Sequence, residues 1–130
     1  MAKKSKILVV DDEKALRSAL KDKLVLEGFE VMEAKDGNEG LNKALAEHPD
    51  LILLDVMMPK MDGMEVIQKL QDDKWGRTAK VIMLTNVSDP IKVAEVTETG
   101  SKNMTIYDYM IKSDWKLEEV VEKIRSKLEK

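Results

Sequence analysis

Carboxylate side chains follow two strongly apolar stretches of the chain. Asp11 and Asp12 come directly after Ile7–Val10, and Asp55 comes directly after Leu51–Leu54. Short apolar runs without alternation are typical of strands that are buried on both faces of a parallel sheet. Because ligands bind at the carboxyl ends of such strands, we expect the three carboxylates to converge at one edge. Their mutual repulsion predicts a bound Mg²⁺ among them, with Asp55 able to act as a nucleophile.

Two further predicted strands are followed by polar residues that suit a phosphoryl group. The apolar strand predicted at 80–84 is followed by Thr85, and the strand predicted at 105–111 is followed by Lys112. A hydroxyl and an ammonium beside a bound Mg²⁺ can hold phosphoryl oxygens while Asp55 attacks the phosphorus. Lysine supplies the point charge that phosphate binding requires. The pattern therefore indicates phosphoryl-transfer chemistry at the sheet edge.

The elements that must position these residues alternate along the chain. Strands are predicted at 7–10, 29–34, from 51 onward, 80–84 and 105–111, and helices at 14–26, 37–46, 64–70, 88–100 and 117–128. This alternation predicts an α/β fold with a doubly wound, five-stranded parallel sheet in the order 2-1-3-4-5 and five helices, as in flavodoxin-like folds. The second and fifth strands carry more polar residues, so we expect them to be lateral.

Local signals refine several of these boundaries. Gly28 is predicted to end the first helix, whose apolar residues at helical spacing run from Ala15 to Val25. Asp62 is predicted to cap the third helix, and residues 75–78 are predicted to form a loop.

The composition excludes several classes of protein. The 130 residues predict a single domain over 1–130, and 43% hydrophobic residues are enough to fill its core. The formal net charge is −3 with both signs interspersed, so nucleic-acid binding by this domain is not expected. Cysteine is absent, which excludes disulfides and thiolate metal sites and suits a reducing cytoplasm. No stretch approaches the length of a membrane span or a signal peptide.

Five motifs in order resemble the receiver domain of two-component response regulators, in its CheY-like, single-domain form. They are Val-Val-Asp-Asp-Glu at 9–13, Leu-Leu-Asp-Val-Met-Met-Pro at 53–59, Met-Asp-Gly at 61–63, Leu-Thr-Asn at 84–86 and Asp-Tyr-Met-Ile-Lys at 108–112. No single motif is decisive, but five at the expected strand ends are highly specific. The resemblance covers nearly the whole chain.

The resemblance implies a role for each site residue. Asp55 would accept a phosphoryl group from a phosphohistidine on a sensor histidine kinase or a phosphotransfer protein. Asp12 would bind Mg²⁺ directly and Asp11 mainly through water. The resemblance also implies that the Met57 backbone carbonyl is a metal ligand and that Thr85 and Lys112 hold the phosphate. Thr85 and Tyr109 would be the switch residues: Tyr109 would turn inward when Thr85 moves toward the phosphate.

The resemblance also implies how the signal would leave the domain. Phosphorylation would change the face formed by helix four, strand five and helix five, which would then bind a downstream protein, with the chain a monomer or a phosphorylation-dependent dimer. The chain would be a signalling phospho-acceptor that catalyses only its own phosphorylation and dephosphorylation, and not otherwise an enzyme. The sequence fits either a stand-alone regulator or a part of a longer one.

Three features depart from the family's pattern. Ser113 stands where the family usually has a proline after a cis peptide bond, and a cis bond without proline costs about 2.5–4 kcal/mol. Asn86 follows Thr85 where a small residue is common, which we expect to alter the lifetime of the acyl phosphate. The segment 100–105 is longer than the family's usual loop before strand five.

Other interpretations compete with this one. Asp11 and Asp12 could be an N-cap pair of the first helix. A haloacid-dehalogenase-like phosphatase also uses a strand-end aspartate with Mg²⁺, but it carries a second aspartate two positions later, where this chain has Met57. A flavodoxin-like flavin carrier would need a phosphate loop after the first strand, which is missing. A pseudo-receiver that binds partners without phosphorylation remains as an alternative, although the acidic set is complete.

Overall fold

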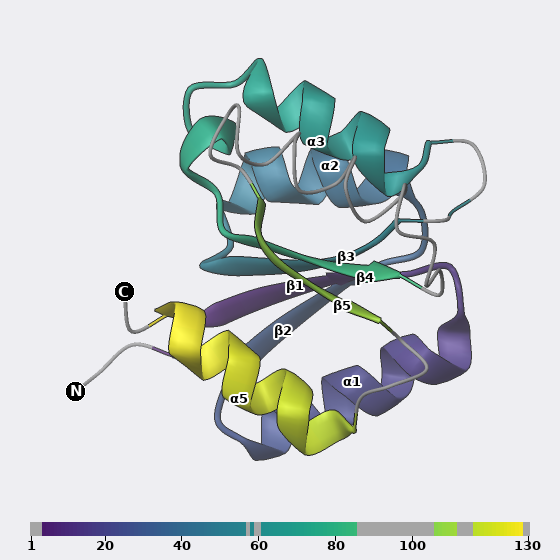
Figure 1. Ribbon diagram of the computed structural model, residues 1–130, viewed down its shortest axis with the longest axis vertical. Coiled ribbons are helices and arrows are strands. Elements are labelled where there is room, and N and C mark those ends of the chain that lie inside the picture. The colour runs from purple at the N-terminus through teal and green to yellow at the C-terminus, as the bar shows by residue number, and fades with distance from the viewer. Residues whose placement is uncertain (1–3, 57, 59–60, 86–105, 112–115, 129–130) are drawn as a thin grey trace.

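The computed structural model describes residues 4–56, 58, 61–85, 106–111 and 116–128, with the backbone alone described for Thr85, 106–109 and 111. Its described part is a parallel β-sheet between two layers of helices (Figure 1). Helices α2 (Gly37–Glu47) and α3 (Gly63–Gln71) cover one face, and α1 (Lys14–Leu26) and α5 (Leu117–Leu128) cover the other. The layered α/β architecture that the sequence predicts is confirmed.

The sheet contains five strands in the order β2-β1-β3-β4-β5. Their bounds are Lys6–Val10 for β1, Glu30–Ala34 for β2, Leu51–Asp55 for β3, Val81–Thr85 for β4 and Ile106–Ile111 for β5. Every pair of neighbouring strands is parallel. The predicted order is therefore confirmed, with β2 and β5 at the edges, and the carboxyl ends of β1 and β3 lie side by side.

Burial on both faces explains why β1 and β3 are the central strands. Leu8, Val10, Ile52 and Leu54 pack with α2 and α3, whereas the alternate residues of the same strands pack with α1 and α5: Ile7, Val9, Leu51 and Leu53. Each of these eight side chains is at most 1% exposed. Full burial of such a side chain is worth roughly 1.5–3 kcal/mol. The two strand ends that carry the carboxylates therefore extend from fully buried strands.

Most predicted helix boundaries are close to the observed ones. Helices α1 and α5 have the predicted bounds, and Gly28, which follows α1, has a φ of 96°. Asp62 caps α3 as predicted, because its Oδ1 accepts a hydrogen bond of 2.9 Å from the Glu65 N–H. The predicted helix at 88–100 lies outside the described residues.

One local prediction was wrong, and one apolar position of α1 lies outside the core. Residues Gly76–Thr78 form a 3-10 turn and not an irregular loop, since the Gly76 N–H donates to Asp73 Oδ2 at 2.9 Å and the chain passes closely over the end of α3. Val25 does not face the core: Val25 and Leu26 are 52% and 83% exposed. The inward face of α1 ends at Leu24, which packs in the core with Leu20.

Candidate functional site

Asp55 is the last residue of β3 and is held in a fixed backbone frame. Its side chain is buried, with the residue 2% exposed. The next residue, Val56, donates to the Leu84 carbonyl at 2.9 Å, so the pairing with β4 continues past the end of the strand. The Gly63 N–H then donates to the Val56 carbonyl at 2.9 Å, which attaches the start of α3 to this turn. The backbone directly after Asp55 is therefore tied both to β4 and to the start of α3.

Asp11 occupies the corresponding place at the end of β1. It is fully buried, its N–H donates to the Ala34 carbonyl at 3.1 Å, and its Oδ1 accepts from the Glu13 N–H at 2.9 Å. The N-cap residue of α1 is Glu13, whose own side chain makes no capping hydrogen bond. The interpretation of Asp11 and Asp12 as an N-cap pair is therefore wrong: Asp11 closes a turn before the helix.

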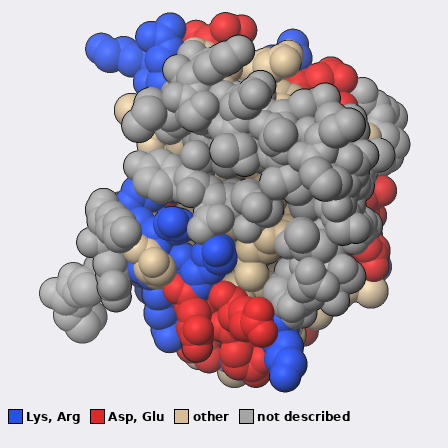
Figure 2. Space-filling model, viewed as in Figure 1, with Lys and Arg blue, Asp and Glu red and all other residues tan. Residues whose placement is uncertain are grey.

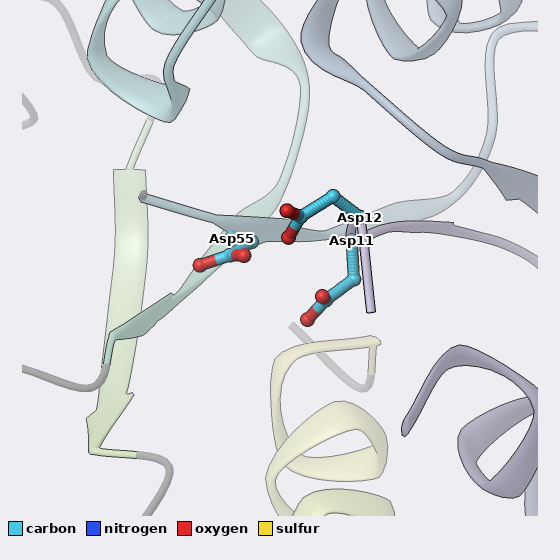
Figure 3. A group of neighbouring side chains, drawn as sticks. All are labelled: Asp11, Asp12 and Asp55. Carbon is cyan, nitrogen blue, oxygen red and sulfur yellow. The ribbon is translucent and has the colours of Figure 1, made fainter. Parts of the chain in front are cut away.

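The three predicted carboxylates meet at the edge of the sheet. Asp11, Asp12 and Asp55 each offer an oxygen within 4.8 Å of the others, and Asp12 is the exposed member of the group. Figure 3 shows them at the neighbouring ends of β1 and β3. The convergence that the sequence predicts is confirmed, and it combines two buried acids with one that solvent can reach.

The donor chemistry of this cluster fits a hard divalent cation. Two unit negative charges 4.8 Å apart repel by roughly 3 kcal/mol at an effective dielectric constant of about 20. A cation with a preference for oxygen ligands removes that repulsion, and one or two carboxylates are enough to hold Mg²⁺ while water fills its other positions. Asp12, the exposed member, is in contact with solvent.

The other predicted site residues are described in part or not at all. Thr85 is the last residue of β4 and is paired with Ile111, and Tyr109 lies in β5 opposite Met83. The side chains of Thr85 and Tyr109 are outside the described residues, as are the whole of Met57, Asn86, Lys112, Ser113 and the segment 100–105. Their predicted roles stay predictions.

Two residues near the carboxylates were missed by the sequence analysis. Arg17 Nη1 donates to the Asp11 carbonyl oxygen at 2.8 Å, and its Nε lies 3.3 Å from Glu33 Oε1. The signal that could have indicated the first contact is the spacing of Arg17, one helical turn beyond Glu13. The second contact depends on how α1 crosses β2, which no local pattern specifies.

A comparison with protein-family models matches residues 7–125 to the response regulator receiver domain. The chain belongs to this family. Among curated proteins, the receiver domain resembles the alkaline phosphatase synthesis transcriptional regulatory protein PhoP of Bacillus subtilis, with 42% identity over 107 residues and 82% of this chain covered. The match spans 42% of PhoP and also 42% of the first curated relatives, so the receiver domain covers about two fifths of their length.

Solved structures share the fold over almost the whole receiver domain. A putative response regulator from Chloroflexus aurantiacus has a TM-score of 0.87 at 26% identity, covering 98% of this chain and 100% of that one. The structure of a CheX-CheY-BeF3-Mg²⁺ complex from Borrelia burgdorferi has a TM-score of 0.81 at 25% identity, covering 94% and 87%. Within the parts of the receiver domain that the structure describes, every helix is too short or too polar to cross a membrane.

Proposed function

We propose that this receiver domain accepts a phosphoryl group on Asp55 in a Mg²⁺-dependent reaction. The observation that carries the proposal is the convergence of Asp11, Asp12 and Asp55 within 4.8 Å at the carboxyl ends of β1 and β3. Two carboxylates are enough for a metal, which leaves an oxygen of the third for covalent chemistry. Asp55 is the best candidate for this role because it is buried at the end of β3, where the next residue, Val56, is bonded to both β4 and α3.

The donor would be a phosphohistidine on a sensor histidine kinase or a phosphotransfer protein. An Asp55 oxygen attacks the phosphorus in line, a P–O bond forms, and the P–N bond breaks with its electron pair returning to the imidazole. The other ring nitrogen carries a proton, so the imidazole leaves as a neutral histidine side chain. The second product is an aspartyl phosphate, which is a mixed anhydride. Mg²⁺, when bound, neutralises charge that the phosphoryl oxygens carry in this reaction. Asp11 and Asp12 would hold the ion together with Asp55 and the Met57 carbonyl.

The remaining roles follow the family's pattern. Thr85 and Lys112 would bind the phosphoryl oxygens, and Thr85 would move toward them while Tyr109 turns inward. Such a change is a two-state equilibrium that the new charge biases. The face containing β5 and α5 would then bind a downstream protein. In this scheme the receiver domain is a cytoplasmic signalling switch and not an enzyme acting on other substrates.

The names of the curated relatives favour a regulator of transcription as the whole protein. PhoP is named a transcriptional regulatory protein, and this chain spans 42% of it.

The surface charge of the domain itself favours a protein partner. In Figure 2, acidic and basic side chains adjoin over the layer that contains α1 and α5. Ion pairs such as Arg125–Glu27 and Lys23–Glu118 lie in this layer. This mixed charge supports a protein partner for the domain and not nucleic acid.

Exposure to acetyl phosphate tests the proposal. The intact mass of the wild-type chain should rise by one phosphoryl group in the presence of Mg²⁺ and stay unchanged when the metal is chelated. Asp55→Asn preserves the shape of the side chain and should show no gain, while Asp62→Asn, an acid that caps α3, should behave as wild type. No mass gain at any Mg²⁺ concentration would favour the pseudo-receiver.

A further inference from the structure

Arg17 connects the acidic cluster to the edge strand of the sheet. Its side chain is mostly covered, with 15% exposed. One nitrogen, Nη1, donates to the carbonyl oxygen of Asp11 at 2.8 Å, and another, Nε, lies 3.3 Å from Glu33 Oε1 on β2. The planar guanidinium holds its nitrogens apart in a fixed fork, so Nη1 and Nε reach two separate acceptors at once. A lysine has three N–H donors, but they share one nitrogen on a flexible stem and lack this fixed geometry.

The carbonyl that Arg17 binds belongs to the peptide that joins Asp11 to Asp12. The other polar groups of Asp11 on this side are already engaged, since its N–H donates to Ala34 and its Oδ1 accepts from Glu13. Arg17 fixes the orientation of the next peptide plane, and hence the direction in which Asp12 leaves the strand. Asp12 is exposed, so packing contributes little to its placement.

Glu33 keeps the guanidinium in place from the other side. It lies on β2 opposite Val9 of β1, and its carboxylate also lies 3.5 Å from Lys21 Nζ through Oε2. Lys43 on α2 donates to the Glu33 backbone carbonyl. Glu33 is therefore held by residues from both helical layers, and it gives Arg17 a fixed anchor.

We propose that Arg17, anchored by Glu33, is a positioning residue that orients the Asp11–Asp12 peptide for Mg²⁺ binding. This inference rests on the proposed function, because it assigns Arg17 to the same metal site. Partners that orient metal ligands typically change metal affinity by 10–100-fold when they are removed. Arg17 acts through a backbone carbonyl, so we expect the low end, a loss of about tenfold.

The sign of the effect separates this role from simple electrostatics. Arg17 is a cation close to a site for a cation. If its charge alone mattered, its removal would strengthen Mg²⁺ binding, because a repulsion would disappear. If Arg17 orients the ligands, its removal weakens Mg²⁺ binding even though the repulsion between the two cations is also removed. A role in stability alone would lower the free energy of unfolding and leave the Mg²⁺ affinity of the folded chain unchanged.

The experiment is a Mg²⁺ titration of the unphosphorylated chain, followed by the NMR shifts of the Asp12 and Glu13 amides. Arg17→Met should bind Mg²⁺ about tenfold more weakly than wild type. Lys21→Met is the matched control: it removes an equal charge one turn along α1, from the same carboxylate, without touching Asp11. It should stay within about twofold of wild type or bind slightly more tightly.

Arg17→Lys provides a second variant if Arg17→Met does not fold. It keeps the charge but loses the two-ended contact, so it should also bind Mg²⁺ more weakly, whereas an effect of charge alone predicts no change. Wild-type affinity in both folded Arg17 variants, tighter binding, or an equal loss in Lys21→Met would overturn the inference. A wild-type chain that binds no Mg²⁺ would instead refute the proposed function, so the two failures are distinguishable.

Discussion

Gly63→Ala is expected to damage both stability and the presentation of Asp55. A Cβ at this position would lie 2.5 Å from the Asp55 carbonyl oxygen, 2.9 Å from Val56 Cα and 3.0 Å from Met83 Cε. Two of these three atoms are backbone atoms of the turn that follows β3 and cannot rotate away. These close contacts can be relieved only if α3 moves outward, and that movement strains the hydrogen bond from the Gly63 N–H to the Val56 carbonyl.

The size of the effect follows from these contacts. Overpacking of a dense core costs about 1–3 kcal/mol, and a weakened backbone hydrogen bond adds about 0.5–1.5 kcal/mol. The better helix propensity of alanine returns at most about 1 kcal/mol. We expect the free energy of unfolding to fall by about 1–3 kcal/mol in urea titrations at constant m-value. For a chain of 130 residues, the midpoint of thermal unfolding should fall by roughly 4–11 °C.

Gly28→Ala is the matched control for this substitution. Gly28 has a φ of 96° and a Cβ there would meet no atom within 4 Å, so the cost is backbone strain of about 1–2 kcal/mol far from the carboxylates. Both variants should lose stability, but only Gly63→Ala should slow phosphorylation of the folded chain by acetyl phosphate. A Gly63→Ala chain as stable as wild type, within about 0.5 kcal/mol, would refute the close approach of α3 to Asp55.

Two further predictions concern the ends of helices. Asp62→Ala removes the acceptor of the Glu65 N–H and should lower the free energy of unfolding by about 1 kcal/mol in urea titrations; no loss would contradict the cap. Hydrogen bonds from Lys23 and then Arg125 hold the pKa of Glu27 below its usual value of 4.5. A lowered folded-state pKa gives stability that is present above the unfolded pKa and is lost as pH falls through the folded one. Glu27→Gln should therefore be less stable than wild type at neutral pH, with the difference shrinking below about pH 4.5 in urea titrations; a difference independent of pH would refute this linkage.

The central sheet and the carboxylate cluster could be predicted because their signals are local. The apolar runs before Asp11 and Asp55 indicate buried parallel strands, and parallel strands bring their carboxyl ends to one edge. Geometry of this kind needs no knowledge of side-chain packing. Asp62 was predictable for the same reason, since a cap depends only on residues within one turn.

Features that depend on the crossing of elements could not be predicted. The Arg17–Glu33 contact joins positions 16 residues apart and exists only because α1 lies over β2. The 3-10 turn at Gly76–Thr78 forms where the chain passes the Leu70 carbonyl, with no room for a Cβ on Gly76. Val25 fits the apolar spacing of α1, yet it is exposed because the core beneath the helix extends only as far as Leu24.

The central claim is that Asp55 accepts the phosphoryl group, and identifying the phosphorylated residue by chemical modification tests it most directly. After treatment with acetyl phosphate and Mg²⁺, reduction with borohydride converts an aspartyl phosphate to homoserine, which peptide mass spectrometry places in the sequence. The account predicts homoserine at position 55 alone, and none when Mg²⁺ is chelated. Homoserine at Asp11 or Asp12, or modification that does not depend on the metal, would contradict it.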